Sequence, residues 1–162
     1  MKKYIKILSI VLLVLVICGC SLLKESEKTY TANGISITMK KGFYEKDYVS
    51  LTTYFESEDA IFTALKESYT DLEEAGLSAS STLNEYIQAV KEGNQLDTEI
   101  LEDDGLLYMT YEKEISNKDF FYLATVYKTE DAFWLINFAC ESKNKNTLKP
   151  QFLKWAKTVE FK

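Results

Sequence analysis

The sequence predicts a single α+β domain in which an antiparallel β-sheet lies between two helical layers. Four β-rich runs after residue 97 are separated only by short polar breaks, which is typical of an antiparallel meander. The run 132–140 (AFWLINFAC) is largely apolar on both alternating faces, so both faces of the sheet need cover. Helical patterns at 83–92 and 148–157 can provide that cover.

A secretory signal is predicted at the start of the chain. Three lysines within the first six residues precede an apolar run at residues 7–17. As a helix, these 11 residues span only about 16 Å at about 1.5 Å per residue, roughly half of the bilayer core. A cleaved signal is therefore favoured over a permanent transmembrane helix.

The end of this run, Ile17-Cys18-Gly19-Cys20, resembles the lipobox of bacterial lipoproteins. In that motif an aliphatic residue, a small residue and Gly precede an invariant Cys. The resemblance implies cleavage between Gly19 and Cys20 and lipidation of Cys20; the alternative is an ordinary signal peptide with incidental cysteines. The expected division of the chain is a lipoprotein signal peptide at 1–19, a lipidated Cys and tether at 20–28, and a single domain at 29–162.

Charge and composition exclude several classes of function. The chain has 25 acidic residues and 19 basic residues, all of them Lys, and it has no His. Serine triads, Cys-His pairs, histidine metal sites and arginine phosphate clamps each need a residue type that is missing. An acidic domain without basic clusters also argues against nucleic acid. We expect no cofactor, no metal and no nucleic-acid partner.

The first half of the domain is predicted to contain two pairs of strands. Asn33-Gly34 favours a type I′ turn, which predicts a hairpin formed by residues 29–31 and 35–39. The runs at 49–56 and 60–67 are rich in β-branched and aromatic residues, so each is expected to be a strand.

Two helices are expected between these strands and the meander. Residues 69–75 are expected to form a short helix that ends at Gly76. A firmer helix is predicted at 83–92, with one apolar face. Thr82 and Glu85 are expected to form its capping box, and Gly93 is expected to end it.

The second half is predicted to contain the meander, a final helix and a short closing strand. The C-terminal helix is expected at 148–157, with Pro150 in its first turn, where an N–H has no helical partner. Its apolar side carries Leu148, Phe152, Trp155 and Ala156. The strands are expected at 97–102, 106–114, 120–128, 132–140 and 158–161.

This order of elements, together with scattered sequence features, resembles the PsbP-like group over roughly residues 30–161. The group includes extrinsic accessory proteins of photosystem II, Ran-binding Mog proteins and uncharacterised lipoproteins of Gram-positive bacteria, and this chain looks most like the last. The resemblance implies a three-layer α/β/α sandwich with a mainly antiparallel sheet and no shared chemistry. Lys41 stands where many members carry Pro, and no binding residue is carried over. The features are Asn33-Gly34-Ile35-Ser36-Ile37, Gly42-Phe43, Leu83-Asn84-Glu85-Tyr86, the strand Gly105 to Tyr111, Asp131-Ala132-Phe133-Trp134 and Trp155-Ala156-Lys157-Thr158-Val159.

Few residues have side chains that are candidates for catalysis or metal binding. Glu112 and Glu114 lie two apart on one strand, hence about 7 Å apart on one face, a separation between those of retaining and inverting glycosidases; a solvated strand end is the favoured interpretation. The acidic run Glu102-Asp103-Asp104 offers oxygens for Ca²⁺ but lacks the spaced ligand pattern, so a hairpin turn is favoured. Cys140 has no His or Arg to form its thiolate and is expected to be a small buried or strand-end residue.

Aromatic residues are the remaining candidates for binding. Trp134 and Trp155 lie on apolar stripes and are expected in the core. Four tyrosines near polar residues are candidates to present amphipathic rings to a partner: Tyr44, Tyr48, Tyr54 and Tyr69.

The expected function is a lipid-anchored, non-catalytic interaction or accessory module at the extracytoplasmic face of the cell membrane. Its expected partners are the membrane, through the lipid anchor, and a membrane or cell-wall protein. Two alternatives stay open, a carrier of a small ligand at the membrane surface and a hydrolase directed at the cell wall. The sequence by itself assigns no catalytic, ligand-binding or metal residue.

Overall fold

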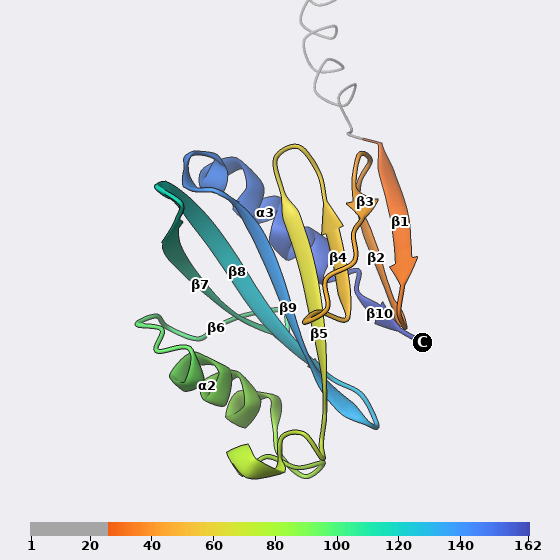
Figure 1. The fold of residues 1–162 in the computed structure, drawn as a ribbon, viewed down its shortest axis with the longest axis vertical. Helices are drawn as coiled ribbons and strands as arrows, with labels where there is room; N and C mark the ends of the chain where they lie inside the picture. Colours follow the sequence, from red (N-terminus) through yellow and green to blue (C-terminus); the bar gives the residue numbers. More distant parts are fainter. Residues whose placement is uncertain (1–25) are drawn as a thin grey trace, which may run out of the picture.

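The computed structural model describes residues 26–162, which form two antiparallel β-sheets and two α-helices (Figure 1). The predicted signal, Cys20 and most of the predicted tether lie outside the described residues. None of the helices formed by residues 26–162 has the length and apolar character needed to cross a bilayer.

The larger sheet has seven strands in the order β3-β4-β5-β9-β8-β7-β6, and every neighbouring pair is antiparallel. The predicted meander is confirmed, because the last four strands of this sheet along the chain, β6 to β9, each pair with the next one. The bounds are β3 Tyr44–Glu45, β4 Thr53–Glu56, β5 Ile61–Ser68, β6 Leu101–Asp103, β7 Leu106–Ile115, β8 Lys118–Lys128 and β9 Ala132–Glu141.

The smaller sheet joins the two ends of the described chain. Strands β1 (Glu27–Ala32) and β2 (Ile35–Lys40) form the predicted hairpin, and β10 (Glu160–Phe161) pairs with the other edge of β2. Asn33 and Gly34, at the turn, have φ angles of 48° and 85°, as a type I′ turn requires. Strand β1 begins at Glu27, within the segment predicted as tether.

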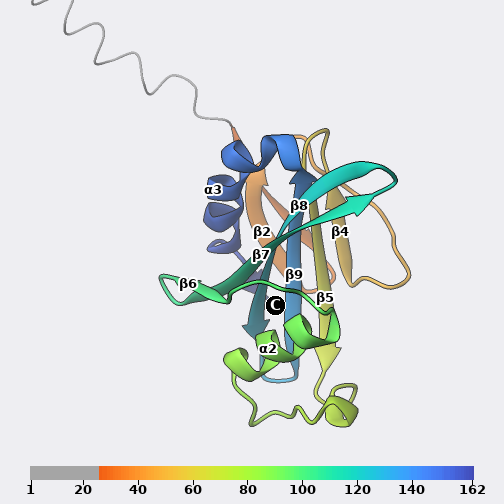
Figure 2. The same ribbon diagram turned by 90° about the vertical axis from the view of Figure 1, so that its left-hand side faces the viewer.

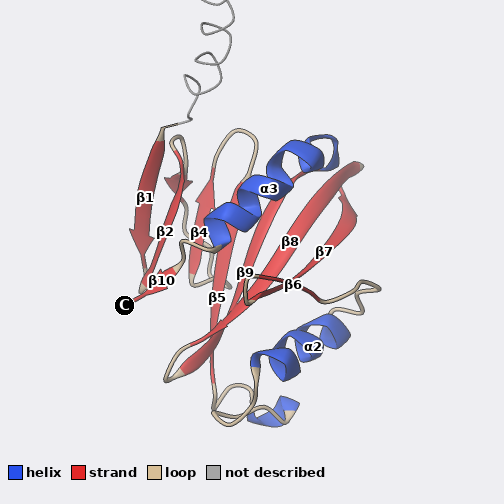
Figure 3. Cartoon of the chain, turned by 180° about the vertical axis from the view of Figure 1, so that it is seen from behind, coloured by secondary structure: helices blue, strands red, loops and turns tan. Residues whose placement is uncertain are grey.

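Two helices cover opposite faces of the large sheet, which confirms the predicted α/β/α sandwich. Helix α2 (Leu83–Gly93) lies on one face, where the Tyr86 ring stacks on Phe133 of β9 at 4.5 Å between centroids. Helix α3 (Lys145–Ala156) and the small sheet cover the other face (Figures 2 and 3), and Phe152 of α3 stacks on Phe138 of β9 at 5.3 Å. The predicted apolar side of α3 is buried.

Helix α2 begins at the predicted capping box. The Thr82 hydroxyl accepts a hydrogen bond from the Glu85 backbone N–H, and the Glu85 carboxylate accepts one from the Thr82 N–H. The predicted stop at Gly93 is off by two residues. Gly93 is still helical, and the left-handed conformation falls on Gln95, with φ 54°.

Four elements differ from the sequence expectation. The strand predicted from residue 49 starts only at Thr53, because residues 46–52 form the loop that returns the chain from β3 to its neighbour β4. The strand predicted at 97–102 is reduced to β6, and the helix predicted at 69–75 to one 3₁₀ turn at Glu73–Ala75. Pro150 is the sixth residue of α3 rather than in its first turn, because the helix begins earlier, after a 3₁₀ turn at Ser142–Asn144.

Two glycines make a matched pair for testing this backbone. We expect Gly34→Ala to lower the free energy of unfolding by about 1–2 kcal/mol, because its φ of 85° is left-handed. Gly93→Ala should raise it by up to about 1 kcal/mol, because Gly93 is helical and a Cβ there meets nothing within 4 Å. Urea denaturation of residues 26–162 measures both, and equal effects would contradict the assigned turn.

Candidate functional site

Helix α2 covers only part of its face of the large sheet. It lies across the end where β5 finishes (Figure 1), and the strands continue beyond it. Ala139 points to the same side as Phe133, which α2 covers, because residues an even number apart on a strand share a face. Ala139 belongs to a row of side chains that runs in register across six strands: Tyr44, Glu56, Ile61, Ala139, Tyr122 and Tyr111.

We call the uncovered part of this face the open face. It consists of that row and of the adjoining residues Tyr54, Thr63 and Asn137, which are in register on β4, β5 and β9. Most of its side chains are half-buried, and Tyr44 at its edge is 50% exposed. The open face is therefore a broad surface that combines aromatic rings with hydroxyl and amide groups.

Tyrosines are paired at both sides of the open face. The Tyr48 ring, from the loop after β3, stacks on Tyr54 at 4.8 Å, and Tyr111 stacks on Tyr122 at 4.9 Å. Burial, with the nearby Glu56 carboxylate, raises the pKa of Tyr54, and burial raises the pKa of Tyr111 to about 12. At neutral pH both hydroxyls are protonated, and that of Tyr111 can donate a hydrogen bond to a partner.

A polar network fixes one side of this surface. The Tyr54 hydroxyl donates to Glu56 Oε2 at 3.1 Å, and the same oxygen accepts from Lys46 Nζ at 2.6 Å. The hydrogen bond from the Lys46 ammonium lowers the pKa of Glu56, so this carboxylate is charged at neutral pH. Glu56 is therefore an acceptor that is held in place beside the aromatic rings.

A cleft of about 850 Å³ adjoins the open face. The two surfaces are continuous, because Glu56, Ile61 and Ala139 line both. Side chains of both charges line the cleft, and two pairs are in contact at 2.5 Å, Lys40 with Asp59 and Lys143 with Glu141. Ser26, where the described chain begins, also lines it.

Cys140 lines the cleft, but its thiol is not poised for reaction. The residue is 2% exposed, as the sequence predicted for a buried position. Burial raises the pKa of the thiol to about 11, with a further contribution from the charges of Asp59 and Glu112. The nucleophilic thiolate is therefore a minor species at neutral pH.

Glu112 and Glu114 lie where a solvated strand end was expected. The Glu112 carboxylate accepts a hydrogen bond from Lys145 of α3 at 2.6 Å, so it points to the α3 side, away from the open face. Lys145, with the Ser142 hydroxyl, lowers the pKa of Glu112, whereas a general acid needs a raised one. Glu114 is exposed near the end of β7.

The acidic run at 102–104 forms the predicted hairpin turn. Asp104 and Gly105 have φ angles of 52° and 80° between β6 and β7. The Lys157 ammonium lies 3.0 Å from an Asp103 oxygen and 2.7 Å from one of Asp104, so these carboxylates contact a lysine. Within residues 26–162, no group of three or more potential metal ligands occurs.

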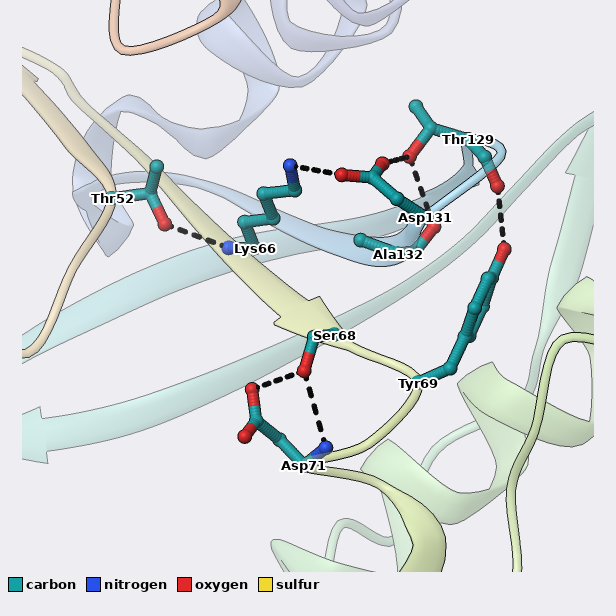
Figure 4. A network of polar contacts seen from close by, with 8 residues as sticks. All are labelled: Thr52, Lys66, Ser68, Tyr69, Asp71, Thr129, Asp131 and Ala132. Carbon is teal, nitrogen blue, oxygen red and sulfur yellow. Dashed lines mark hydrogen bonds and ion pairs between the residues drawn. The ribbon is translucent and has the colours of Figure 1, made fainter.

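The aromatic expectations separate into core and surface. Trp134 and Trp155 are buried, at 3% and 1% exposure, as predicted. Tyr69, predicted as a candidate for binding, is instead held in the structure: its hydroxyl donates to the Thr129 carbonyl at 2.5 Å (Figure 4), and its ring contacts Phe133 edge-on. In the same network Lys66 pairs with Asp131. The hydrogen bond from Tyr69 to Thr129 joins the segment before α2 to the β8–β9 turn.

Sequence reasoning found part of this site. Tyr44, Tyr48 and Tyr54 were candidates, and the structure brings them together. Tyr111 and Tyr122 were missed, because only the pairing of β7 with β8 places their rings against each other. The cleft was also missed, since its walls come from segments about 100 residues apart.

Comparisons with known proteins bear on the fold alone. No family model matches the chain, and no curated protein sequence matches it. Among solved structures, the solution structure of cyanobacterial PsbP (CyanoP) from Synechocystis sp. PCC 6803 is similar at 14% identity and a TM-score of 0.49, covering 88% of this chain and 96% of that one.

A second similar structure is a crystal structure from Bacteroides thetaiotaomicron VPI-5482, with 11% identity and a TM-score of 0.54. The match covers 85% of this chain and 49% of that one, so this chain spans about half of its length. At such identities the likeness concerns architecture, and it carries no residue of the site from one protein to another.

The buried thiol gives a test of the cleft wall. In a chain of residues 26–162, Cys140 is the single cysteine. With a pKa of about 11, about one thiol in a thousand is ionised at pH 8, so we expect Ellman's reagent to react more than about 100-fold more slowly than after unfolding in urea. Equal rates in the folded and unfolded protein would place Cys140 in solvent.

Proposed function

We propose that this protein is an extracytoplasmic binding module, anchored to the cell membrane by lipid on Cys20, that acts through the open face and the adjoining cleft. It carries out no catalysis in this proposal. Its partner is a membrane or cell-wall protein, and kinship with the uncharacterised lipoproteins of Gram-positive bacteria forms part of the proposal.

The observation that carries the proposal is the open face, the part of the large sheet that α2 leaves uncovered. Its paired tyrosines combine a large apolar area with a hydroxyl that can donate a hydrogen bond, and tyrosine is enriched in protein interfaces for this reason. Tyr44 and Tyr48 are 50% and 54% exposed, whereas many other aromatic rings of the domain are buried in the cores on the two faces of the sheet. A protein partner would remove these rings from water.

The residues with acid or nucleophile chemistry support a binding role over a hydrolytic one. The Glu112 carboxylate is held by Lys145 on the far side of the sheet, and Cys140 has a raised pKa. Neither group faces the open face.

The cleft favours the second candidate, a carrier of a small ligand. Its volume of about 850 Å³ falls within the usual range of ligand pockets. Its lining is mostly polar and charged, however, whereas such pockets are usually lined by apolar side chains. The carrier therefore ranks below the binding module.

Lipid anchoring has a direct test in Cys20→Ala. The wild-type protein should partition into the detergent phase of a phase-separating detergent. Two acyl chains contribute about 0.8 kcal/mol per buried CH₂ and so exceed the marginal hold of one chain. The variant should keep its signal, lack the lipid and partition into the aqueous phase, with unchanged circular dichroism. Wild-type protein found in the aqueous phase would contradict the proposal.

The role of the open face is tested by crosslinking in cells. The double variant Tyr44→Ser and Tyr48→Ser should lose most of the protein partner that the wild type captures, because both exposed rings would be removed from the contact. Leu101→Ser is the matched control, since Leu101 is 36% exposed and lies on β6 at the far edge of the sheet. Equal capture by all three proteins would place the partner elsewhere.

A further inference from the structure

We propose that the end of the domain at the cleft faces an anionic membrane surface, while the end at α2 points away from it. The inference rests on the proposed anchor at Cys20 and goes beyond it. An anchor fixes only the point of attachment, whereas the distribution of charge over the domain decides the orientation of the domain relative to the membrane.

The point of attachment lies at the cleft. Ser26 lines the cleft, and β1 begins at Glu27, at the end of the molecule opposite α2 (Figure 1). Cys20 lies six residues before Ser26 in the sequence, which at about 3.3–3.6 Å per residue allows at most about 22 Å between them. The cleft therefore stays close to the bilayer in every orientation of the domain. The end with α2 is the part whose distance from the bilayer changes with the orientation.

The acidic residues are concentrated in the part whose distance from the bilayer changes. Residues 67–104 contain 11 carboxylates and one lysine, a formal charge of −10. The rest of the described chain has 13 carboxylates and 14 lysines, a formal charge of +1. The acidic segment runs from the end of β5 through α2 to β6, and its part up to the end of α2 occupies the end of the domain away from Ser26. Its last part, β6, lies nearer the middle, where Asp103 and Asp104 contact Lys157.

This asymmetry orients the domain on an anionic surface. The potential of such a surface decays over a Debye length of about 8 Å at physiological salt, so only groups near the lipid headgroups respond to it. Laying the domain down would bring the segment of charge −10 into that layer. Standing it on the cleft end keeps the acidic segment outside that layer, and that orientation has the lower free energy.

The end that faces the membrane has groups suited to a headgroup layer. Ile115, at the tip of the β7–β8 hairpin, is 43% exposed, and on either side of it a lysine is next to a carboxylate, Lys113 to Glu114 and Lys118 to Asp119. Figure 2 shows this hairpin in the half of the domain opposite α2, where it projects sideways from the sheet. An exposed apolar side chain on a tip where the charges nearly balance can approach a headgroup layer with less repulsion than the acidic segment.

The orientation has a consequence for the open face. Its strands run from the cleft end toward α2, so the face stands upright on the membrane and is accessible from the side. In this orientation the cleft lies at the end of the domain nearest the headgroups. The two continuous surfaces then meet different surroundings, the cleft the lipid and the open face a neighbouring protein.

The test uses the full lipidated chain in vesicles of phosphatidylcholine with about one third phosphatidylglycerol. A fluorophore is attached either to the variant Ile115→Cys or to Glu92→Cys, and the vesicles contain a lipid with a nitroxide on its headgroup. Cys20 is acylated and Cys140 is buried, so the label reaches the new thiol. We expect quenching to be several-fold stronger at position 115 than at position 92, and the difference to shrink at about 1 M salt, where the Debye length is about 3 Å.

A pair of charge variants separates electrostatic orientation from simple attachment. Glu73→Gln with Glu74→Gln removes two charges from the acidic end and should reduce the ratio of quenching between the two positions. Glu58→Gln with Glu114→Gln removes two charges from the other end and should maintain or raise that ratio. All four carboxylates are exposed, so neither pair should affect folding.

The outcomes distinguish the two proposals. If the protein floats with the vesicles but both labels are quenched equally, the anchor holds and the orientation is wrong. Stronger quenching at position 92, or a ratio unaffected by salt and by the charge variants, also overturns it. Wild-type protein that does not float with the vesicles overturns the anchor and, with it, the orientation.

Discussion

Strand β9 has apolar side chains on both of its faces, and the rest of the domain is arranged to remove both faces from water. Phe133 packs under Tyr86 of α2, while Phe138 packs under Phe152 of α3. A sheet with one wet face would leave one of these sets exposed. The central position of β9, between β5 and β8, follows from the same constraint, because an inner strand has two neighbours to complete its cover.

The covers on the two faces are unequal, and this inequality creates the candidate site. The face with α3 also has the small sheet, whose buried residues Ile35, Ile37 and Met39 extend the core. The other face has α2 alone, an 11-residue helix. At about 1.5 Å per residue, α2 is about 16 Å long and cannot cover seven strands at about 4.8 Å spacing. The uncovered part has tyrosine, threonine and asparagine where the covered part has phenylalanine and leucine.

The ends of the domain differ in charge as well as in cover. Helix α2 belongs to the segment with the excess negative charge, whereas the rest of the described chain has lysines and carboxylates in near balance. In the lining of the cleft, the ion pair of Lys40 with Asp59 joins the end of β2 to the β4–β5 turn. The end opposite α2 therefore combines the start of the described chain with the cleft.

The sequence by itself determined the elements whose signals are local. Asn33-Gly34 set the first turn, Thr82 and Glu85 set the start of α2, and the two-sided apolar run of β9 required the sandwich. The tertiary structure alone decided where α2 ends on the sheet, and so which tyrosines stay uncovered. It also decided that Tyr111 meets Tyr122 and that Tyr69 is held by Thr129. These depend on strand register and helix placement, which arise from contacts between distant residues and leave no periodic signal in the chain.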